Sequence, residues 1–423
     1  MERNSLTYQT YVQILKEELL PAMGCTEPIA IAYCAAKARE ELGCLPDTIE
    51  VEASGNIIKN VKGVVVPNTG GRKGLEAAAA IGVLGGEADK GYEVIAGINA
   101  ETKERLAPYL EKTPIRVRPA NSDYVLDVSV LVRRGEHYAL VRAVNEHTNV
   151  VRVEKDGRVL LDRRPAEAQT DKSREMLNIR DIYDFAKTAD LADVREILAR
   201  QIRCNSAISA EGLRGDYGAN IGRTLLRAYG DNVRIRARAA AAAGSDARMN
   251  GCEMPVVINS GSGNQGMTAS LPVIEYAKDR GASEEELYRA LLVSNLVTLH
   301  QKTGIGRLSA YCGAVSAGAG AGAGIAFLCG ADYETVAHTV VNAVAVTSGI
   351  VCDGAKASCA GKISVAVDAG IMGYEMCRNG NNFCAGDGIL AGGVEDTIEN
   401  VGRLGRVGMR DTDREIIKMM TGN

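Results

Sequence analysis

The stretch from residue 309 to 363 holds Cys312, Cys352 and Cys359 among glycines, alanines and serines, with few bulky side chains nearby. Six residues separate Cys352 from Cys359. That interval is too long for a zinc knuckle but short enough for both sulfurs to reach one inorganic centre. Soft thiolate ligands suit iron–sulfur chemistry. We therefore expect these three cysteines to bind a metal cluster.

Cys25 stands just before a predicted alanine-rich helix that runs from about residue 29 to 42. Thr26 is suited to cap this helix, with Pro28 in its first turn. A thiol beside the positive end of a helix has a lowered pKa. We interpret Cys25 as a reactive thiol, and the alternative is a cysteine that only fills space, like Cys34.

Lys356 lies inside the interval between two of the predicted ligands. A cation there lowers the pKa of neighbouring thiols and offsets cluster charge, so we assign Lys356 to the catalytic set. His300 and Lys302 are each either a base or carboxylate partner, or an ordinary helix residue, and both interpretations stay open. His137 and His147 fall among predicted strands, and we interpret them as edge-strand histidines.

A glycine-rich run, Asn-Ser-Gly-Ser-Gly-Asn-Gln-Gly, occupies residues 259–266 and precedes a helical pattern. It fits neither a phosphate-binding P-loop nor the dinucleotide fingerprint. Its amides and hydroxyls could hold a carboxylate. A plain connection between two helices is the alternative. The predicted substrate-binding residues are Ser260, Ser262, Asn264 and Gln265.

The overall composition is that of a globular protein of 423 residues with a formal charge of -4. This charge gives no reason to expect nucleic acid or an anionic membrane as a partner. The eleven cysteines follow no apolar leader, so we expect reduced thiols and a cytoplasmic location. The uncharged run 308–331 is too weakly hydrophobic for a membrane span and predicts a buried helix. A homo-oligomer is compatible with the sequence, which gives no oligomeric state.

Helical and strand periodicities divide the chain into two parts. Helical spacing dominates near the start and again after about residue 171, whereas strand patterns fill much of the region between 47 and 161. We predict an α+β protein with a mainly helical catalytic domain, residues 1–45 plus 170–423. A smaller α+β domain, residues 46–169, is inserted into it. This arrangement would let Cys25 meet Cys352.

Four motifs, in this order, resemble the iron–sulfur L-cysteine desulfidases, a family related to the alpha-chain domain of iron–sulfur L-serine dehydratases. The motifs are Gly24–Pro28, Asn259–Gly266, Ala310–Gly313 and Cys352–Cys359. The resemblance covers the full length. It implies a 4Fe-4S cluster held by Cys312, Cys352 and Cys359, with one iron open to substrate and Cys25 close by.

The resemblance also implies an activity, the β-elimination of L-cysteine to hydrogen sulfide, ammonia and pyruvate. An open iron would act as a Lewis acid toward the leaving sulfur while a base removes the α proton. We therefore expect no pyridoxal phosphate. Two alternatives remain: L-serine dehydration, because the substrates differ by one atom, and a non-catalytic cluster or zinc module. The tail 419–423 lacks the C-terminal cysteine of some dehydratases, which favours the desulfidase.

Overall fold

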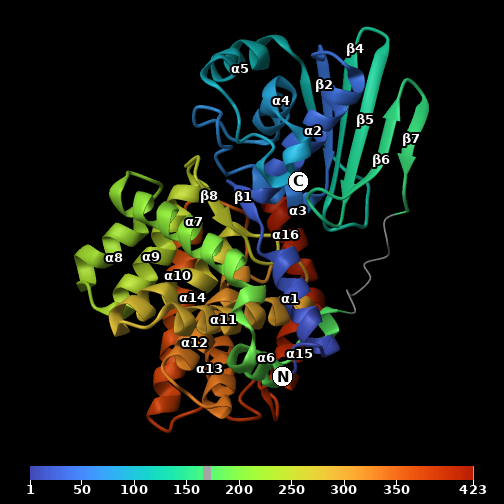
Figure 1. Cartoon of the computed structure of the whole chain (residues 1–423). Helices are drawn as coiled ribbons and strands as arrows, with labels where there is room; N and C mark the ends of the chain where they lie inside the picture. The colour runs from blue at the N-terminus through green and yellow to red at the C-terminus, as the bar shows by residue number, and fades with distance from the viewer. Residues whose placement is uncertain (165–172, 423) are drawn as a thin grey trace.

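The computed structural model describes residues 1–164 and 173–422 and shows an α+β protein (Figure 1). A mainly helical body lies below a part built on a six-stranded mixed sheet. The predicted fold class is confirmed. The predicted domain boundary near residue 170 lies outside the described residues.

The six-stranded sheet has the order β3-β2-β4-β5-β6-β7. Only β2 and β3 run parallel; the other neighbouring pairs are antiparallel. Alternate side chains of β2 are buried, as expected for a sheet with one covered face. The strands are β2 (Thr48–Ala53), β3 (Ile115–Pro119), β4 (Asp127–Arg134), β5 (His137–Val144), β6 (Val150–Lys155) and β7 (Arg158–Asp162).

Helix α2 (Thr26–Leu42) packs between this sheet and α4 (Leu75–Gly85). The approach is close, since a Cβ on Gly82 would lie 2.4 Å from the carbonyl oxygen of Ala32. The predicted domain of residues 1–45 plus 170–423 groups α2 with the C-terminal helices. Its side chains are instead buried in the core of the sheet-containing part, because small residues on several faces let it pack on two elements at once. The other helices of this part are α3 (Gly55–Val61), η1 (Ala88–Glu93) and α5 (Ala100–Lys112).

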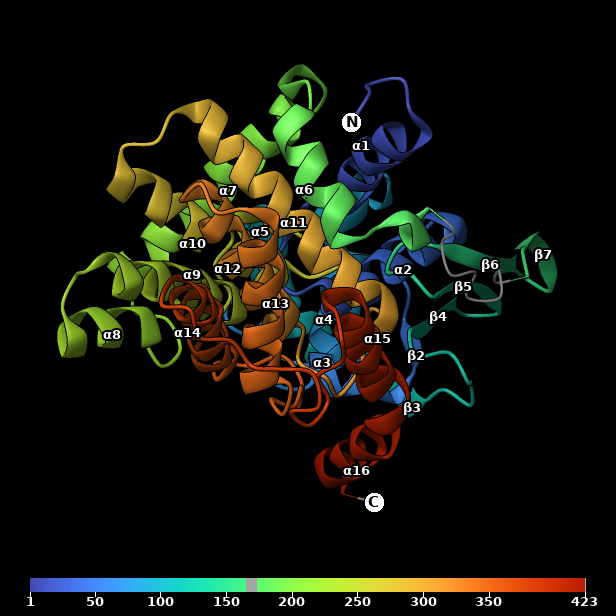
Figure 2. The same ribbon diagram turned by 90° about the horizontal axis from the view of Figure 1, so that it is seen from below.

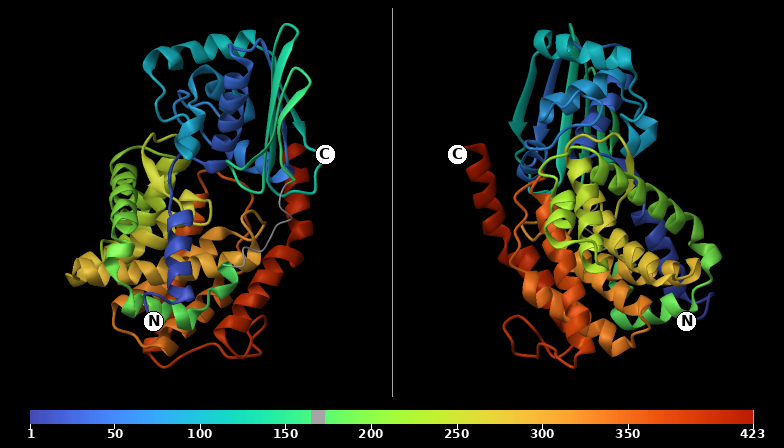
Figure 3. Two further views of the ribbon diagram at one scale, coloured as in Figure 1. Left: turned by 45° about the vertical axis from the view of Figure 1, so that its right-hand side comes forward. Right: turned by 90° about the vertical axis from the view of Figure 1, so that its left-hand side faces the viewer.

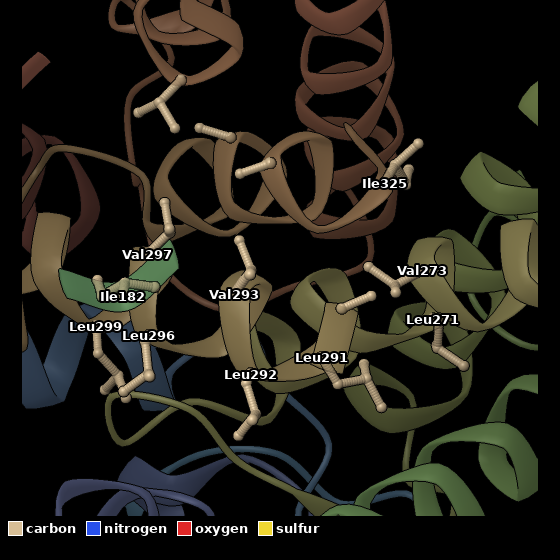
Figure 4. Packing of buried hydrophobic residues seen from close by; sticks show 14 of the residues in the cluster. Ile182, Leu271, Val273, Leu291, Leu292, Val293, Leu296, Val297, Leu299 and Ile325 are labelled. Carbon is tan, nitrogen blue, oxygen red and sulfur yellow. The ribbon is translucent and has the colours of Figure 1, made fainter. Parts of the chain in front are cut away.

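The helical body has a continuous core centred on α11 and α12 (Figure 2). Figure 4 shows leucines and valines of α11, among them Leu291 and Val293, between neighbouring helices that contribute Val273 and Ile325. The helices are α1 (Leu6–Glu18), α6 (Ile179–Thr188), α7 (Arg195–Arg214), α8 (Ile221–Tyr229), α9 (Val233–Met249), α10 (Gly263–Arg280), α11 (Glu284–Ile305), α12 (Gly313–Leu328), α13 (Tyr333–Thr347), α14 (Cys359–Arg378), α15 (Val394–Arg403) and α16 (Arg410–Thr421). Short helical turns are η2 (Arg174–Met176), η3 (Leu191–Asp193) and η4 (Leu404–Gly408).

Glycines bring α12 and α14 together. A Cβ on Gly318 would lie 2.3 Å from the carbonyl oxygen of Ala366, and one on Gly322 would lie 2.4 Å from that of Gly370. The two backbones therefore touch, which explains the alternating glycines and alanines of α12. The buried helix predicted within 308–331 is confirmed. Across the residues that the structure covers, no helix has the length and apolarity needed to cross a bilayer.

The C-terminal helix α16 leaves the helical body and extends toward the sheet-containing part (Figure 3). It packs beside α3. There the fully buried ammonium of Lys59 forms an ion pair with Asp413 and donates a 3.3 Å hydrogen bond to the carbonyl of Cys352. Lys59 thus connects α3 with α16 and with the loop that carries Cys352.

Candidate active site

A cavity of about 100 Å³ lies where the two parts of the protein meet. Four helices begin at it. Its lining includes Cys25, Ser262 and Cys312, the N-cap residues of α2, α10 and α12, and Cys359, the first residue of α14. Helix N-termini carry partial positive charge and free amide donors, which suit an anionic ligand such as a carboxylate.

A short two-stranded ribbon joins the two segments that precede two of the predicted motifs. Strand β1 (Pro21–Met23) ends just before Cys25, and β8 (Pro255–Val257) ends just before the glycine-rich run. The strands are antiparallel and pair Pro21 with Val257. The Thr26 hydroxyl donates a 2.9 Å hydrogen bond to the carbonyl oxygen of Gly261 and so connects the two motifs. Residues more than 230 positions apart therefore face one cavity.

The three predicted ligands, Cys312, Cys352 and Cys359, all line this cavity. Backbone bonds link the first two: the Cys312 amide donates to the Ile350 carbonyl (3.1 Å), and the Cys352 amide donates to the Ala310 carbonyl (2.6 Å). Burial raises the pKa of Cys312 to about 12, and the neighbouring Cys352 and Cys359 add to that rise.

The donor set fits a cluster bound through three cysteines. Within residues 1–164 and 173–422, no three His, Cys, Asp or Glu side chains converge tightly enough to chelate one ion. A cluster differs from a single ion because each cysteine binds a separate iron. Lys302 supplies a buried cation close to the thiols: burial lowers its pKa to about 8, against the opposing effect of Cys352 and Cys312.

Cys25 is buried in a small cluster with Val64 and Met249, against which Cys359 also packs. Its thiol donates to Glu27 Oε2 over 2.9 Å. Burial raises the pKa of Cys25 well above its usual value, and the negative charge of Glu27 raises it further. The expected lowering by the helix terminus is wrong, because desolvation and a carboxylate outweigh a partial charge. Cys25 itself, not Thr26, occupies the N-cap position.

Lys356 is placed differently from the predicted ligands. Its ammonium pairs with Asp353 at 2.5 Å and bonds to the Asp353 carbonyl at 3.0 Å, and it does not line the cavity. His300 is also turned away, because its Nε2 pairs with Glu395 at 2.6 Å. Of the two open alternatives, only Lys302 faces the cavity.

The glycine-rich run forms a tight turn followed by the first residues of α10. Asn259 and Ser262 exchange two backbone bonds of 3.1 and 3.0 Å around Ser260 and Gly261, which both have left-handed backbone angles (φ 52° and 76°). The run connects a strand to a helix, not two helices. The predicted substrate-binding side chains that line the cavity are Ser260, Ser262, Asn264 and Gln265.

Several other residues line the cavity whose roles no sequence motif predicted. Glu27 lies two positions after Cys25 and accepts a 3.2 Å bond from Asn60. Arg248 interrupts the small residues at the end of α9, which was a usable signal for a special position. Arg307 follows α11 and bonds to Glu18 over 3.0 Å.

His147 comes from the connection between β5 and β6 and is 1% exposed, so the edge-strand interpretation is wrong for it. Burial lowers its pKa to about 4, which leaves the imidazole neutral at physiological pH. Its Nδ1 lies 3.4 Å from the Tyr92 hydroxyl, and its Nε2 has no partner among the described residues. No local pattern marked this residue. His137 is exposed at the start of β5, beside Asp156.

Comparisons with known proteins identify the family of the chain. The family described as serine dehydratase alpha chain matches residues 89–418. A UPF0597 protein of Desulfitobacterium hafniense is 57% identical, covering 99% of this chain and 98% of that protein. UPF0597 proteins of Lachnoclostridium phytofermentans and Treponema denticola are 50% and 45% identical, each covering at least 98% of both chains. The chain therefore belongs to the UPF0597 family and carries a serine dehydratase alpha-chain domain.

Proposed function

We propose that the protein is an L-cysteine desulfidase, a carbon–sulfur lyase that converts L-cysteine and water to pyruvate, ammonia and hydrogen sulfide. The serine dehydratase alpha-chain domain indicates a dehydratase-like lyase. The observation that carries the proposal is the grouping of Cys312, Cys352 and Cys359 around one small cavity that also holds the Cys25 thiol. The cavity volume suits a small amino acid.

The proposed cofactor is a 4Fe-4S cluster held by Cys312, Cys352 and Cys359. When bound, such a cluster supplies a Lewis acid at the iron that lacks a cysteine ligand. The partial positive charges at the starts of α12 and α14, together with buried Lys302, offset thiolate charge at this place. No pyridoxal phosphate is needed for this chemistry.

The protein's own residues would bind the substrate and move its α proton. The start of α10 offers Ser260, Ser262, Asn264 and Gln265 to the substrate carboxylate. Cys25 is the proposed reactive thiol. The Glu27 carboxylate, whose Oε2 accepts the hydrogen bond of the Cys25 thiol over 2.9 Å, is the adjacent proton acceptor in the cavity. For Lys356 we propose a catalytic role through its charge, which acts on the nearby Cys359 thiol from outside the cavity, where Asp353 orients the ammonium.

The experiment for Cys25 replaces it with serine or alanine in protein purified without oxygen. We expect the visible spectrum and the iron and sulfide content to be preserved while sulfide release from cysteine is lost. Loss of the cluster itself would make Cys25 a structural ligand instead. For the loop, Ser262→Ala should raise the KM for cysteine, and an unchanged KM would remove that assignment.

L-serine dehydration is the second candidate function, favoured by the family match itself. Serine carries a hydroxyl where cysteine carries a thiol, and both groups can bind iron. Comparing sulfide release from cysteine with pyruvate release from serine, at matched concentrations, separates the two. A non-catalytic cluster or zinc module predicts a different result after anaerobic reconstitution: no spectral change with either amino acid, or one zinc per chain.

A further inference from the structure

Arg248 brings a permanent positive charge into the cavity. It belongs to α9, is 2% exposed and is among the lining residues. Its guanidinium donates from Nε to the Gly24 carbonyl (2.9 Å) and from Nη1 to Asn264 Oδ1 (3.1 Å). In the described structure its Nη2 has no hydrogen-bond partner. Both acceptors are neutral, so no carboxylate among the described residues pairs with this cation.

A buried cation with neutral acceptors and an unused donor is unfavourable on its own. Such a group in a native protein calls for an explanation, and a ligand that supplies the missing anion is one. The planar fork of arginine matches a carboxylate better than a lysine ammonium does. An anionic ligand group would therefore find in Arg248 a cation that is already desolvated and fixed in place.

The other cations of the cavity are already engaged. Arg307 bonds to the carboxylates of Glu18 at 3.0 Å and Glu146 at 3.2 Å. Lys302 lines the cavity beside Cys312 and Cys352, the proposed cluster ligands, so its charge faces the cluster site. Among the cationic lining residues of the described chain, Arg248 is the one left for a ligand anion.

We infer that Arg248 binds the α-carboxylate of the substrate and that Asn264 is a positioning residue which holds the guanidinium in place. This inference adds a binding residue to the proposed function. It takes from the proposed function that the substrate is an amino acid. It also explains a glycine of the run 259–266: a Cβ on Gly263 would lie 2.4 Å from Arg248 Nε, so only glycine leaves room for the guanidinium.

Calorimetric titration of the oxygen-free holoprotein with L-alanine and L-alaninamide tests the inference. Neither ligand has a leaving group, and they differ in the carboxylate. We expect alanine to bind about 10- to 100-fold more tightly, the range for one charge-assisted hydrogen-bonded pair. Equal affinities, or no binding of alanine, would overturn the assignment. Failure of the proposed lyase activity would be seen separately, as no product from cysteine or serine despite an intact preference for alanine.

Two variants on α9 test whether Arg248 is the residue that recognises the carboxylate of alanine. Arg248→Met keeps much of the side-chain length and removes the charge, so most of the preference for alanine over alaninamide should be lost. Arg238→Met is the matched control: Arg238 lies on the same helix but bonds to Ser364 and pairs with Asp368, away from the cavity. It should keep the preference for alanine. An undiminished preference in Arg248→Met refutes the inference.

Asn264→Asp keeps the test decisive if Arg248→Met does not fold. The substitution is nearly isosteric and places an anion at the atom that lies 3.1 Å from Arg248 Nη1. The new carboxylate should form an ion pair with the Arg248 guanidinium and abolish the preference for alanine over alaninamide. Asn264→Ala should retain part of that preference. Binding of alanine to Asn264→Asp with the affinity of the unaltered protein would refute the assignment.

Discussion

Gly322→Ala should weaken both the fold and the cysteine site. The added Cβ would lie 2.4 Å from the Gly370 carbonyl oxygen and 2.7 Å from its carbon, and both are backbone atoms that no rotamer change can move. Helices α12 and α14 must therefore separate. Overpacking of a core costs up to about 3 kcal/mol. The better helix propensity of alanine returns about 1 kcal/mol. The expected net loss in the free energy of unfolding is about 2 kcal/mol.

The site should respond because Cys312 and Cys359 stand at the starts of these two helices. Urea unfolding and iron content after oxygen-free purification measure the two effects. Gly361→Ala is the matched control on α14, because nothing lies within 4 Å of the Cβ it would add. That variant should gain up to about 1 kcal/mol and keep its iron. If both variants behave alike, the helix crossing does not depend on glycine as argued.

The remaining predictions concern a histidine and a lysine. His147 has its pKa lowered to about 4 by burial, so the unfolded chain binds a proton that the folded protein does not between pH 6.5 and about 4. Stability should fall by about 3 kcal/mol as pH drops through that window. In urea unfolding, the free energy of unfolding of His147→Gln should depend less on pH than that of the unaltered protein. An unchanged slope of this free energy against pH would contradict the lowered pKa of His147. Lys59→Met removes the buried partner of Asp413 and should lower the free energy of unfolding by about 3 kcal/mol and reduce the iron content. Lys62 is exposed, and Lys62→Met should change the free energy of unfolding by no more than about 0.5 kcal/mol. Equal losses in the two variants would refute the role of Lys59.

Sequence patterns predicted the fold class and the buried glycine-rich helix because both follow from local periodicity. They also singled out the cysteines and the run 259–266, which the structure brings to one cavity. They did not find His147 or Arg248, because a lone polar residue shows nothing of its distant neighbours. The direction of the Cys25 pKa shift was wrong for the same reason: it depends on burial and on Glu27, whereas the sequence argument counted only the helix terminus.

The cavity is built jointly by the two parts of the protein, and this bears on how binding and stability are coupled. The sheet-containing part supplies Glu27, Asn60 and His147, and the helical body supplies the cysteines of α12 and α14 and the start of α10. The pairing of β1 with β8 and the contacts of Lys59 with Cys352 and Asp413 connect the two parts beside the cavity. A substrate or cluster that touches both sides binds only the assembled state and must stabilise it. Variants that loosen the junction should therefore lose iron and ligand affinity together, even where no lining residue is changed.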